Sequence, residues 1–167
     1  NVSARQVGDG RFIPSVTQIL SDTGIDPSWL DFEITERLLM SNAPTTRISL
    51  SELNALGVGL SIDDFGTGYS ALSYLQQFRF DILKIDRTFV DRVADDKDSA
   101  ALTKAIIRMA QSLGLKVIAE GVEGEAQLEF LRRHKCDLAQ GYHFSRPVPA
   151  DEFRALLKTD TTEPKAQ

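Results

Sequence analysis

The chain has 167 residues, of which 42% are hydrophobic and 26% are charged, with a net charge of −5, and this composition predicts a folded domain with one core. The acidic balance argues against general nucleic-acid binding through a basic surface, and no apolar run approaches the roughly 20 residues that cross a bilayer, so we expect no membrane insertion of this segment. Cys136 is the only cysteine, which excludes an intrachain disulfide; we expect a cytoplasmic location, with the parent protein either free or tethered to the inner membrane.

Short apolar runs alternate along the chain with longer amphipathic stretches, as strands alternate with helices. We expect strands over residues 30–35, 59–63, 82–85, 116–119 and 138–142. We expect helices over residues 14–22, 45–56, 71–77, 98–113, 125–134 and 150–157. Gly57 and Gly114 are placed to end two of these helices, and Asp98 is placed to begin one.

No linker interrupts this alternation, so we expect one domain over residues 1–158 and a disordered polar tail over residues 159–167. Strand–helix–strand repetition predicts parallel strands, either in an open doubly wound sheet or in a closed (β/α) barrel. Ligands gather at one switch point of a doubly wound sheet, whereas many strand ends converge on one site in a barrel. Polar residues lie at or near the ends of five strands, namely Glu33, Asp63, Lys84, Glu120 and Gln140. This pattern favours a TIM-like (β/α)8 barrel, truncated at its amino terminus because the chain supplies about six of the eight βα units.

The strand-end residues share the phase that would aim them into a common barrel mouth, because side chains alternate in direction along a strand. Carboxylate and amide oxygens suit Mg²⁺, Mn²⁺ or Ca²⁺ better than zinc. The candidate oxygen ligands are Asn1, Glu33, Asp63, Asp64 and Glu120. Two ions that share a bridging carboxylate would clamp a phosphodiester during hydrolysis, and Lys84 would position the attacking water or stabilise negative charge.

Each of these signals also has a structural explanation. Adjacent acids such as Asp63 and Asp64 often cap helices, and the glycines after them suit a turn. Glu120 is compatible with a helix start, where the dipole favours an acid, and Lys84 with an ion pair. The shared phase of the strand-end residues favours the functional explanation over these structural ones.

Longer motifs stand in a fixed order at residues 1–6, 32–36, 61–70, 83–86, 117–123 and 140–147. Through these motifs the chain resembles the EAL-domain family of cyclic-di-GMP-specific phosphodiesterases. The resemblance implies a barrel of modified (β/α)8 topology and hydrolysis of cyclic-di-GMP to linear pGpG by a two-metal-ion mechanism with Mg²⁺ or Mn²⁺. It also implies a homodimer, and an upstream sensor or GGDEF-type domain in the parent protein.

The resemblance implies a role for each residue that matches a motif. The metal ligands would be Asn1, Glu33, Asp63, Asp64 and Glu120, with Asp63 bridging the two ions. The residues at the reaction itself would be Asp63, Asp64, Glu120 and Lys84, with Lys84 orienting the hydrolytic water. The residues that line the substrate site or support the ligands would be Glu123, Gln140 and Gly141. Glu36 would anchor the loop that contains Gly66, Thr67 and Gly68, which in this family links the metal site to the dimer interface.

The Glu-Ala-Leu signature that names the family is absent from the chain and is expected upstream of Asn1. Its glutamate is a metal ligand in the family, so we expect the chain alone to be impaired in turnover. We also expect the chain alone to be poorly stable, because a truncated barrel has unpaired strand edges. Two alternatives are a catalytically silent EAL domain that acts as a cyclic-di-GMP receptor, and a protein-interaction scaffold. The presence of Asp63, Asp64 and Lys84 favours the phosphodiesterase.

Overall fold

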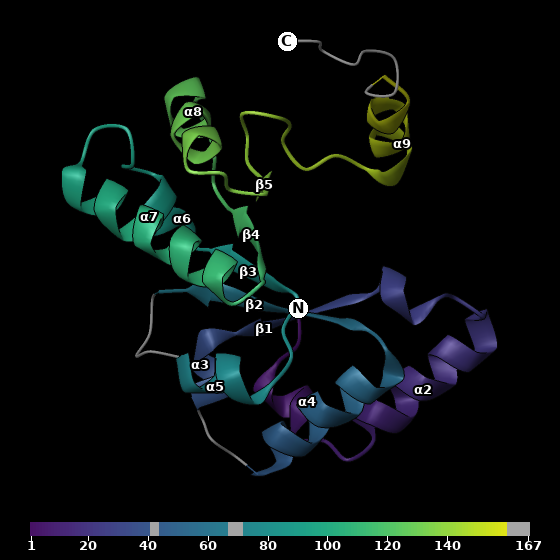
Figure 1. Ribbon diagram of the computed structural model, residues 1–167. Coiled ribbons are helices and arrows are strands. Elements are labelled where there is room, and N and C mark those ends of the chain that lie inside the picture. The colour runs from purple at the N-terminus through teal and green to yellow at the C-terminus, as the bar shows by residue number, and fades with distance from the viewer. Residues whose placement is uncertain (41–43, 67–71, 160–167) are drawn as a thin grey trace.

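The computed structural model of the protein describes residues 1–40, 44–66 and 72–159, in which helices alternate with the strands of one sheet (Figure 1). The strands are β1 (Asp31–Thr35), β2 (Gly59–Phe65), β3 (Ile82–Ile85), β4 (Lys116–Ala119) and β5 (Leu138–Ala139). The helices are α1 (Ala4–Val7), α2 (Phe12–Thr23), α3 (Glu36–Met40), α4 (Pro44–Leu56), α5 (Leu72–Gln77), α6 (Arg87–Val90), α7 (Lys97–Ser112), α8 (Glu125–Arg133), α9 (Ala150–Thr159) and the 3-10 helix η1 (Pro27–Trp29). None of these helices is long and apolar enough to span a bilayer.

The strands form one parallel sheet in the order β1-β2-β3-β4-β5, which is also their order along the chain. Val2 adds a parallel bridge to Ile34 at the β1 edge, where its backbone N–H donates to the Glu33 carbonyl at 2.9 Å. A doubly wound sheet reverses its strand order at a switch point, whereas a barrel is wound in one direction. The observed order therefore confirms the predicted α/β architecture of TIM-like type.

One face of the sheet supplies the hydrophobic core. A row of paired residues, one from each of the first four strands, crosses this face and is fully buried, namely Ile34, Ile62, Leu83 and Val117. Helix α3 contacts β1 and β2, and α7 contacts β3 and β4 (Figure 1). Burial of these apolar side chains is the main favourable contribution to the stability of the fold. Because side chains alternate along a strand, the opposite face carries the polar residues of the candidate site.

Helix α4 shows how the sequence pattern selects a buried face. Ser49, Leu50 and Leu53 are buried, whereas Ile48 is 58% exposed on the other side of the same helix. Their three- and four-residue spacing is the spacing of one face of an α-helix. Gly57, with a φ of 82°, follows the helix in the left-handed conformation that the sequence predicted for this position.

Three short helices, α1, α3 and α6, were not predicted, because four or five residues are too few to show a helical period. Strand β5 is shorter than the predicted 138–142, and β2 extends to Phe65, two residues beyond its predicted end. The expected start of α7 at Asp98 is wrong: the Asp96 carboxylate accepts the Ser99 backbone N–H at 2.9 Å and caps a helix that begins at Lys97.

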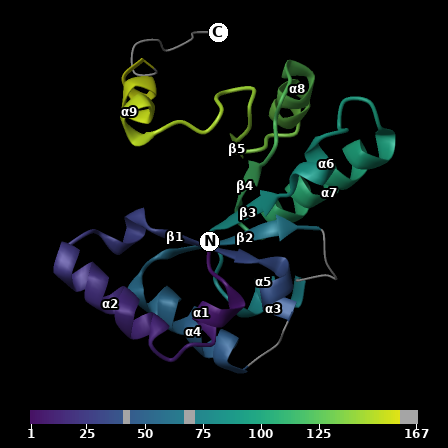
Figure 2. The same ribbon diagram turned by 180° about the vertical axis from the view of Figure 1, so that it is seen from behind.

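The carboxyl-terminal helix α9 stands apart from the sheet in two opposite views (Figure 1; Figure 2). It ends at Thr159, which belongs to the tail that was expected to be disordered. Residues 160–167, the rest of that tail, lie outside the described residues. The expected division into a folded part over 1–158 and a disordered tail therefore stays a prediction.

Substitution Leu53→Ala is expected to lower the free energy of unfolding by about 2–5 kcal/mol, because it removes buried methyl groups and leaves a cavity. Leu53 is fully buried in the core. Ile48→Ala is the matched control, since Ile48 lies on the exposed side of the same helix, and its effect is expected to stay within about 0.5 kcal/mol. Urea denaturation followed by circular dichroism measures both, and equal losses would contradict the buried face assigned to α4.

Candidate active site

Carboxylates on β1, on β2 and directly after β4 surround one lysine on the polar face of the sheet. Lys84 Nζ, on β3, lies 2.7 Å from Glu33 Oε1 on β1 and 3.1 Å from Asp63 Oδ1 on β2. It lies 2.8 Å from Oε1 of Glu120, the residue that follows β4. The Lys84 side chain is only 8% exposed. The structure therefore brings together four of the residues that the sequence placed at one barrel mouth.

The charges of this cluster depend on one another. Burial by itself lowers the pKa of Lys84, but hydrogen bonds to Glu120 and Glu33 and the contact with Asp63 outweigh burial and hold the pKa above its ordinary value. The lysine therefore stays protonated at neutral pH. A protonated lysine can donate hydrogen bonds and offset negative charge, but it cannot take a proton from water.

A β-bulge sets a second acidic residue of β2 opposite the lysine. Ile62 pairs with Leu83 and Phe65 pairs with Ile85, so two residues of β2, Asp63 and Asp64, stand opposite Lys84 alone. Asp64 has a φ of 55°, in the left-handed region that aspartate tolerates better than most residues. The bulge turns Phe65 towards the core, where it is 6% exposed. Strict alternation would direct Asp63 and Asp64 to opposite faces of the sheet. The bulge interrupts this alternation, so both residues stand opposite Lys84.

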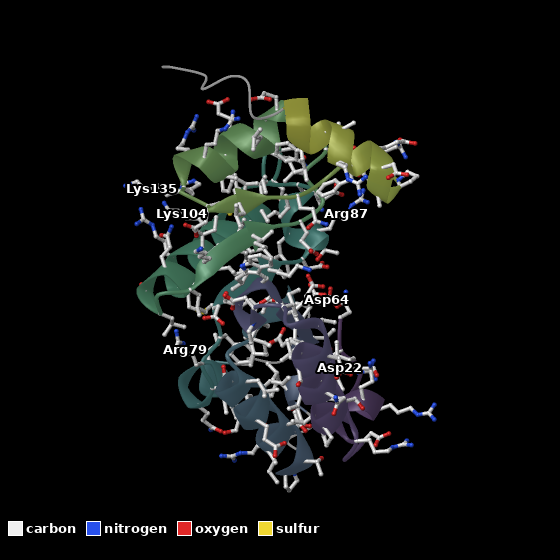
Figure 3. The ribbon with its side chains drawn as sticks, turned by 90° about the vertical axis from the view of Figure 1, so that its right-hand side faces the viewer. Asp22, Asp64, Arg79, Arg87, Lys104 and Lys135 are labelled. Atoms are coloured by element: carbon white, nitrogen blue, oxygen red, sulfur yellow. The ribbon has the colours of Figure 1, made fainter. Side chains whose placement is uncertain are left out.

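Asp64 lies at mid-height of the molecule, between the part that carries Asp22 and the part that carries Arg87 (Figure 3). Burial raises the pKa of Asp64, and the charges of Asp63 and Asp86 raise it further. An acid in this position holds its negative charge at a cost. A cation bound beside it would lower that cost.

The buried carboxylate of Glu36 holds the start of the loop that follows β2. Its Oε2 accepts the Gly66 backbone N–H at 3.0 Å, and Glu36 is 2% exposed. Gly66 has a φ of 99°, and a Cβ at this position would lie 2.8 Å from the Phe89 ring. This geometry fits the expected anchoring role of Glu36 and requires glycine at position 66. Thr67 and Gly68, the other expected loop residues, lie outside the described residues.

The remaining site residues lie beside Glu120. Gln140 continues the pairing beyond β5, where its N–H donates to the Ala119 carbonyl at 2.8 Å and its carbonyl accepts from Val122 at 3.0 Å. A Cβ on Gly141 would lie 2.0 Å from the Val122 carbonyl oxygen, so only glycine fits there. Glu120 does not begin a helix, since α8 starts only at Glu125.

Asn1 lies at the edge of the same site. The bridge between Val2 and Ile34 places Asn1 at the level of Glu33, on the same side of the extended backbone. The amino terminus lies close to β1 and β2 in both ribbon views (Figure 1; Figure 2). Asn1 therefore stands where the sequence expected an amide ligand.

Arg87 is a residue that the sequence analysis missed. Its Nη2 lies 2.8 Å from Glu123 Oε1, and its side chain packs along Gly121. It follows Lys84 by three residues, as Glu123 follows Glu120. This equal spacing is the only signal that could have identified it, and spacing has no meaning until the two strands are known to be neighbours.

A cavity of about 970 Å³ lies at the amino-terminal ends of the strands, on the opposite side of the sheet from the strand ends that carry the acids. Its lining includes Asp31, Gly59 and Asp81 but none of the carboxylates that contact Lys84. Ligands of TIM-like barrels bind at the carboxyl ends of the strands. The acid cluster, and not this cavity, is therefore the candidate active site.

The donor chemistry of the cluster fits a divalent cation, because all the donors are oxygens. Asp63 Oδ1 is buried, and the Lys84 ammonium at 3.1 Å is the cation that it now contacts. The carboxylates now close around the Lys84 ammonium, and no three His, Cys, Asp or Glu side chains in the described ranges are spaced to hold a metal ion as they stand. A metal ion at this cluster would therefore compete with Lys84 for the oxygens that now contact the ammonium.

Comparisons with known proteins agree with this description. A family model described as the EAL domain matches residues 1–147. The chain is 45% identical over 157 residues to the bifunctional diguanylate cyclase/cyclic di-GMP phosphodiesterase MucR of Pseudomonas aeruginosa, covering 94% of this chain and 23% of that protein. It is 44% identical over 167 residues to the cyclic di-GMP phosphodiesterase NbdA of the same species, covering 98% of this chain and 21% of the relative. The chain thus spans less than a quarter of the length of these curated relatives.

Solved structures show the same likeness. The MucR phosphodiesterase in complex with c-di-GMP has a TM-score of 0.86 at 45% identity, covering 92% of this chain and 62% of that one. BlrP1 of Klebsiella pneumoniae has a TM-score of 0.78 at 32% identity, covering 85% of this chain and 36% of that one. BlrP1 has been solved with cyclic di-GMP together with manganese and, separately, with calcium.

Substitution Asp64→Asn is expected to stabilise the metal-free protein at pH 7 by less than about 1 kcal/mol, because the raised pKa of this partly exposed carboxyl makes its charged form unfavourable in the fold. Because the pKa of Asp64 is higher in the folded protein than the value of about 3.9 in the unfolded chain, this carboxyl favours folding at pH values below about 3.9. That contribution is lost as the pH rises through the pKa of Asp64 in the folded protein. The gain should therefore vanish as the pH falls towards about 3.5. Asparagine also tolerates the left-handed backbone, so strain is unchanged.

Urea denaturation in EDTA at several pH values measures this difference. Asp22→Asn is the control, since Asp22 is exposed on α2 and is not among the carboxylates that contact Lys84; Figure 3 labels both Asp22 and Asp64. A gain for Asp64→Asn that is independent of pH, or equal to that of the control, would contradict the electrostatic cost assigned to Asp64.

Proposed function

The chain belongs to the EAL domain family, and from this premise we propose that it carries the hydrolytic site of a phosphodiesterase that converts cyclic-di-GMP to linear pGpG. The observation that supports the proposal most strongly is the Lys84 ammonium among carboxylates on β1, on β2 and directly after β4. A phosphodiester brings negative charge that this cluster alone would repel. Divalent cations on the carboxylates would change the site into one that attracts phosphate.

The residues that would hold two Mg²⁺ or Mn²⁺ ions are Asn1, Glu33, Asp63, Asp64 and Glu120, with Asp63 shared between the ions. Such ions, when bound, polarise the phosphoryl oxygens and lower the pKa of a bound water. The bulge that sets Asp63 and Asp64 together opposite Lys84 supports this assignment, since it gathers oxygens from consecutive residues. The likeness to BlrP1, solved with manganese and cyclic di-GMP, supports the choice of metal.

Lys84 acts as a donor in this proposal. With metal ions on the carboxylates, its ammonium would orient the attacking water or stabilise the negative charge that develops on the phosphate. In the metal-free site, hydrogen bonds to Glu120, Glu33 and Asp63 hold the pKa of Lys84 above its ordinary value, so we assign it the role of a donor. In this proposal the proton of the attacking water goes to a carboxylate of the cluster or to solvent.

The surrounding residues complete the proposal. Glu123, Gln140 and Gly141 line the substrate site or support its ligands, and Glu36 anchors the loop that begins at Gly66. We further propose that the parent protein acts as a homodimer in the cytoplasm, with a sensor or GGDEF-type domain upstream and the folded EAL part over residues 1–158. The bifunctional MucR, which is named for both a cyclase and a phosphodiesterase, supports a further domain in the parent protein.

The full-length protein that contains this chain is expected to convert cyclic-di-GMP to pGpG in Mg²⁺ or Mn²⁺, to stop when EDTA removes the metal, and to recover when metal is restored. Chromatographic separation of the nucleotides measures substrate and product. Tight binding of cyclic-di-GMP without turnover would favour the receptor alternative, and absence of both would favour the scaffold.

Substitution Lys84→Met in the same protein is expected to lower kcat by about 10²–10³-fold, because it removes a charged donor from the transition state. Arg79→Met is the control, since Arg79 is an exposed cation near the opposite edge of the sheet (Figure 3). Initial rates at saturating metal measure both variants, and thermal unfolding checks that each is folded. A folded Lys84→Met variant with an unchanged kcat would exclude the proposed role of Lys84.

A further inference from the structure

Two ion pairs join the end of β3 to the end of β4. The buried pair is Lys84 with Glu120 at 2.8 Å, and the exposed pair is Arg87 with Glu123 at 2.8 Å. Each partner of the second pair lies three residues beyond its counterpart in the first. The two segments are therefore linked at matching positions, once at the candidate site and once outside it.

The Arg87 side chain is fitted closely to the segment that it holds. Gly121 has a φ of 72°, and a Cβ there would lie 2.3 Å from Arg87 Cγ and 2.7 Å from Arg87 Cβ. The aliphatic part of the arginine thus covers the backbone of residue 121, while its guanidinium reaches Glu123. Arg87 contacts the chain at the middle and at the end of the segment that begins with Glu120.

Gln127 of α8 holds the far end of the same segment. It is 8% exposed, and its Oε1 accepts the backbone N–H groups of Glu123 at 2.7 Å and Gly124 at 2.9 Å. Its Nε2 donates to the carbonyls of Asp91 at 3.1 Å and Val90 at 3.4 Å. Because Val90 ends α6, the short helix that Arg87 begins, both ends of α6 are fastened to the segment after β4.

The exposed pair between Arg87 and Glu123 contributes little to the stability of the fold, which favours a role in positioning the chain. The side chains of Arg87 and Glu123 are 55% and 42% exposed, and ion pairs of this exposure add little to folding free energy. A contact can still fix geometry where it adds little stability, since a ligand that is misplaced by about 1 Å loses much of its effect.

Given the proposed function, on which this inference rests, we propose that Arg87 is a positioning residue for Glu120 and Glu123. A metal ion on Glu120 would compete with the Lys84 ammonium for this carboxylate and would weaken the buried link between β3 and β4. The pair between Arg87 and Glu123 lies outside the candidate metal ligands and would hold the segment from Glu120 to Glu123 when the buried link is weakened. Glu120 would then be presented to a metal ion from a backbone that is already positioned.

The test compares Arg87→Met, Arg87→Lys, Glu123→Gln and the double variant Arg87→Met/Glu123→Gln in the full-length protein. Arg87→Met is expected to weaken Mn²⁺ binding and to lower kcat, each by about tenfold, as is usual when a residue that supports a metal ligand is removed. The KM for cyclic-di-GMP should change less than kcat. Arg87→Lys should recover part of the loss, because it retains one charged donor.

The double variant is expected to be no weaker in Mn²⁺ binding than Glu123→Gln alone, because both changes break one link. Arg132→Met is the matched control, since Arg132 makes a similarly exposed ion pair with Glu125 at 3.1 Å but does not contact the segment from Glu120 to Glu123. It should leave Mn²⁺ binding and kcat unchanged. The thermal unfolding midpoints of Arg87→Met and Arg132→Met should differ little from that of the unmodified protein.

Calorimetric titration with Mn²⁺ separates this inference from the proposed function. If Arg87→Met binds Mn²⁺ as tightly as the unmodified protein, or if the losses of the two single variants add, Arg87 does not position the ligand. If the unmodified protein binds Mn²⁺ but does not hydrolyse cyclic-di-GMP, the proposed function fails, and Mn²⁺ affinity still decides the role of Arg87. If it binds no Mn²⁺, both are overturned.

Discussion

The Lys84 ammonium lies within 3.1 Å of carboxylate oxygens from β1, β2 and the end of β4, and the arrangement of the site depends on this contact. Carboxylates this close repel one another unless a cation lies between them. The lysine provides that charge in the fold without adding a proton acceptor. The same contact bears on the proposed function, because a metal ion would compete with the ammonium for Glu33, Asp63 and Glu120.

The parallel sheet allows several charged side chains to lie close together, because one face forms the hydrophobic core and the other face carries the acids. One face presents the apolar row that begins at Ile34 and packs against helices, and this face is rigid because it is fully buried. On the other face, Glu33, Asp63 and Lys84 each follow or precede a residue of this row by one position, so their backbones are held by the core beneath them. The bulge at Asp63 and Asp64 is the single departure from regular pairing in β2, and it falls at the site.

Buried polar side chains hold the loops around this cluster. Glu36 accepts a backbone N–H from Gly66, and Gln127 accepts two from the segment after Glu120. Each buried group is satisfied by backbone, which makes its burial tolerable and ties a loop to a fixed element. Arg87 adds an exposed ion pair with Glu123. The acids therefore project from segments whose positions are set by residues of neighbouring helices.

The sequence alone determined the alternation of strands and helices, the parallel sheet and the strand-end acids, because hydrophobic periodicity and residue order are local properties. It also placed Glu33, Asp63, Lys84 and Glu120 on one face, since the two-residue period of a strand requires no knowledge of neighbours. It could not show how Asp64 joins Asp63, because a bulge is defined only by pairing with another strand. The contact between Arg87 and Glu123 was likewise decided by tertiary structure, which alone sets the distances between residues far apart in the chain.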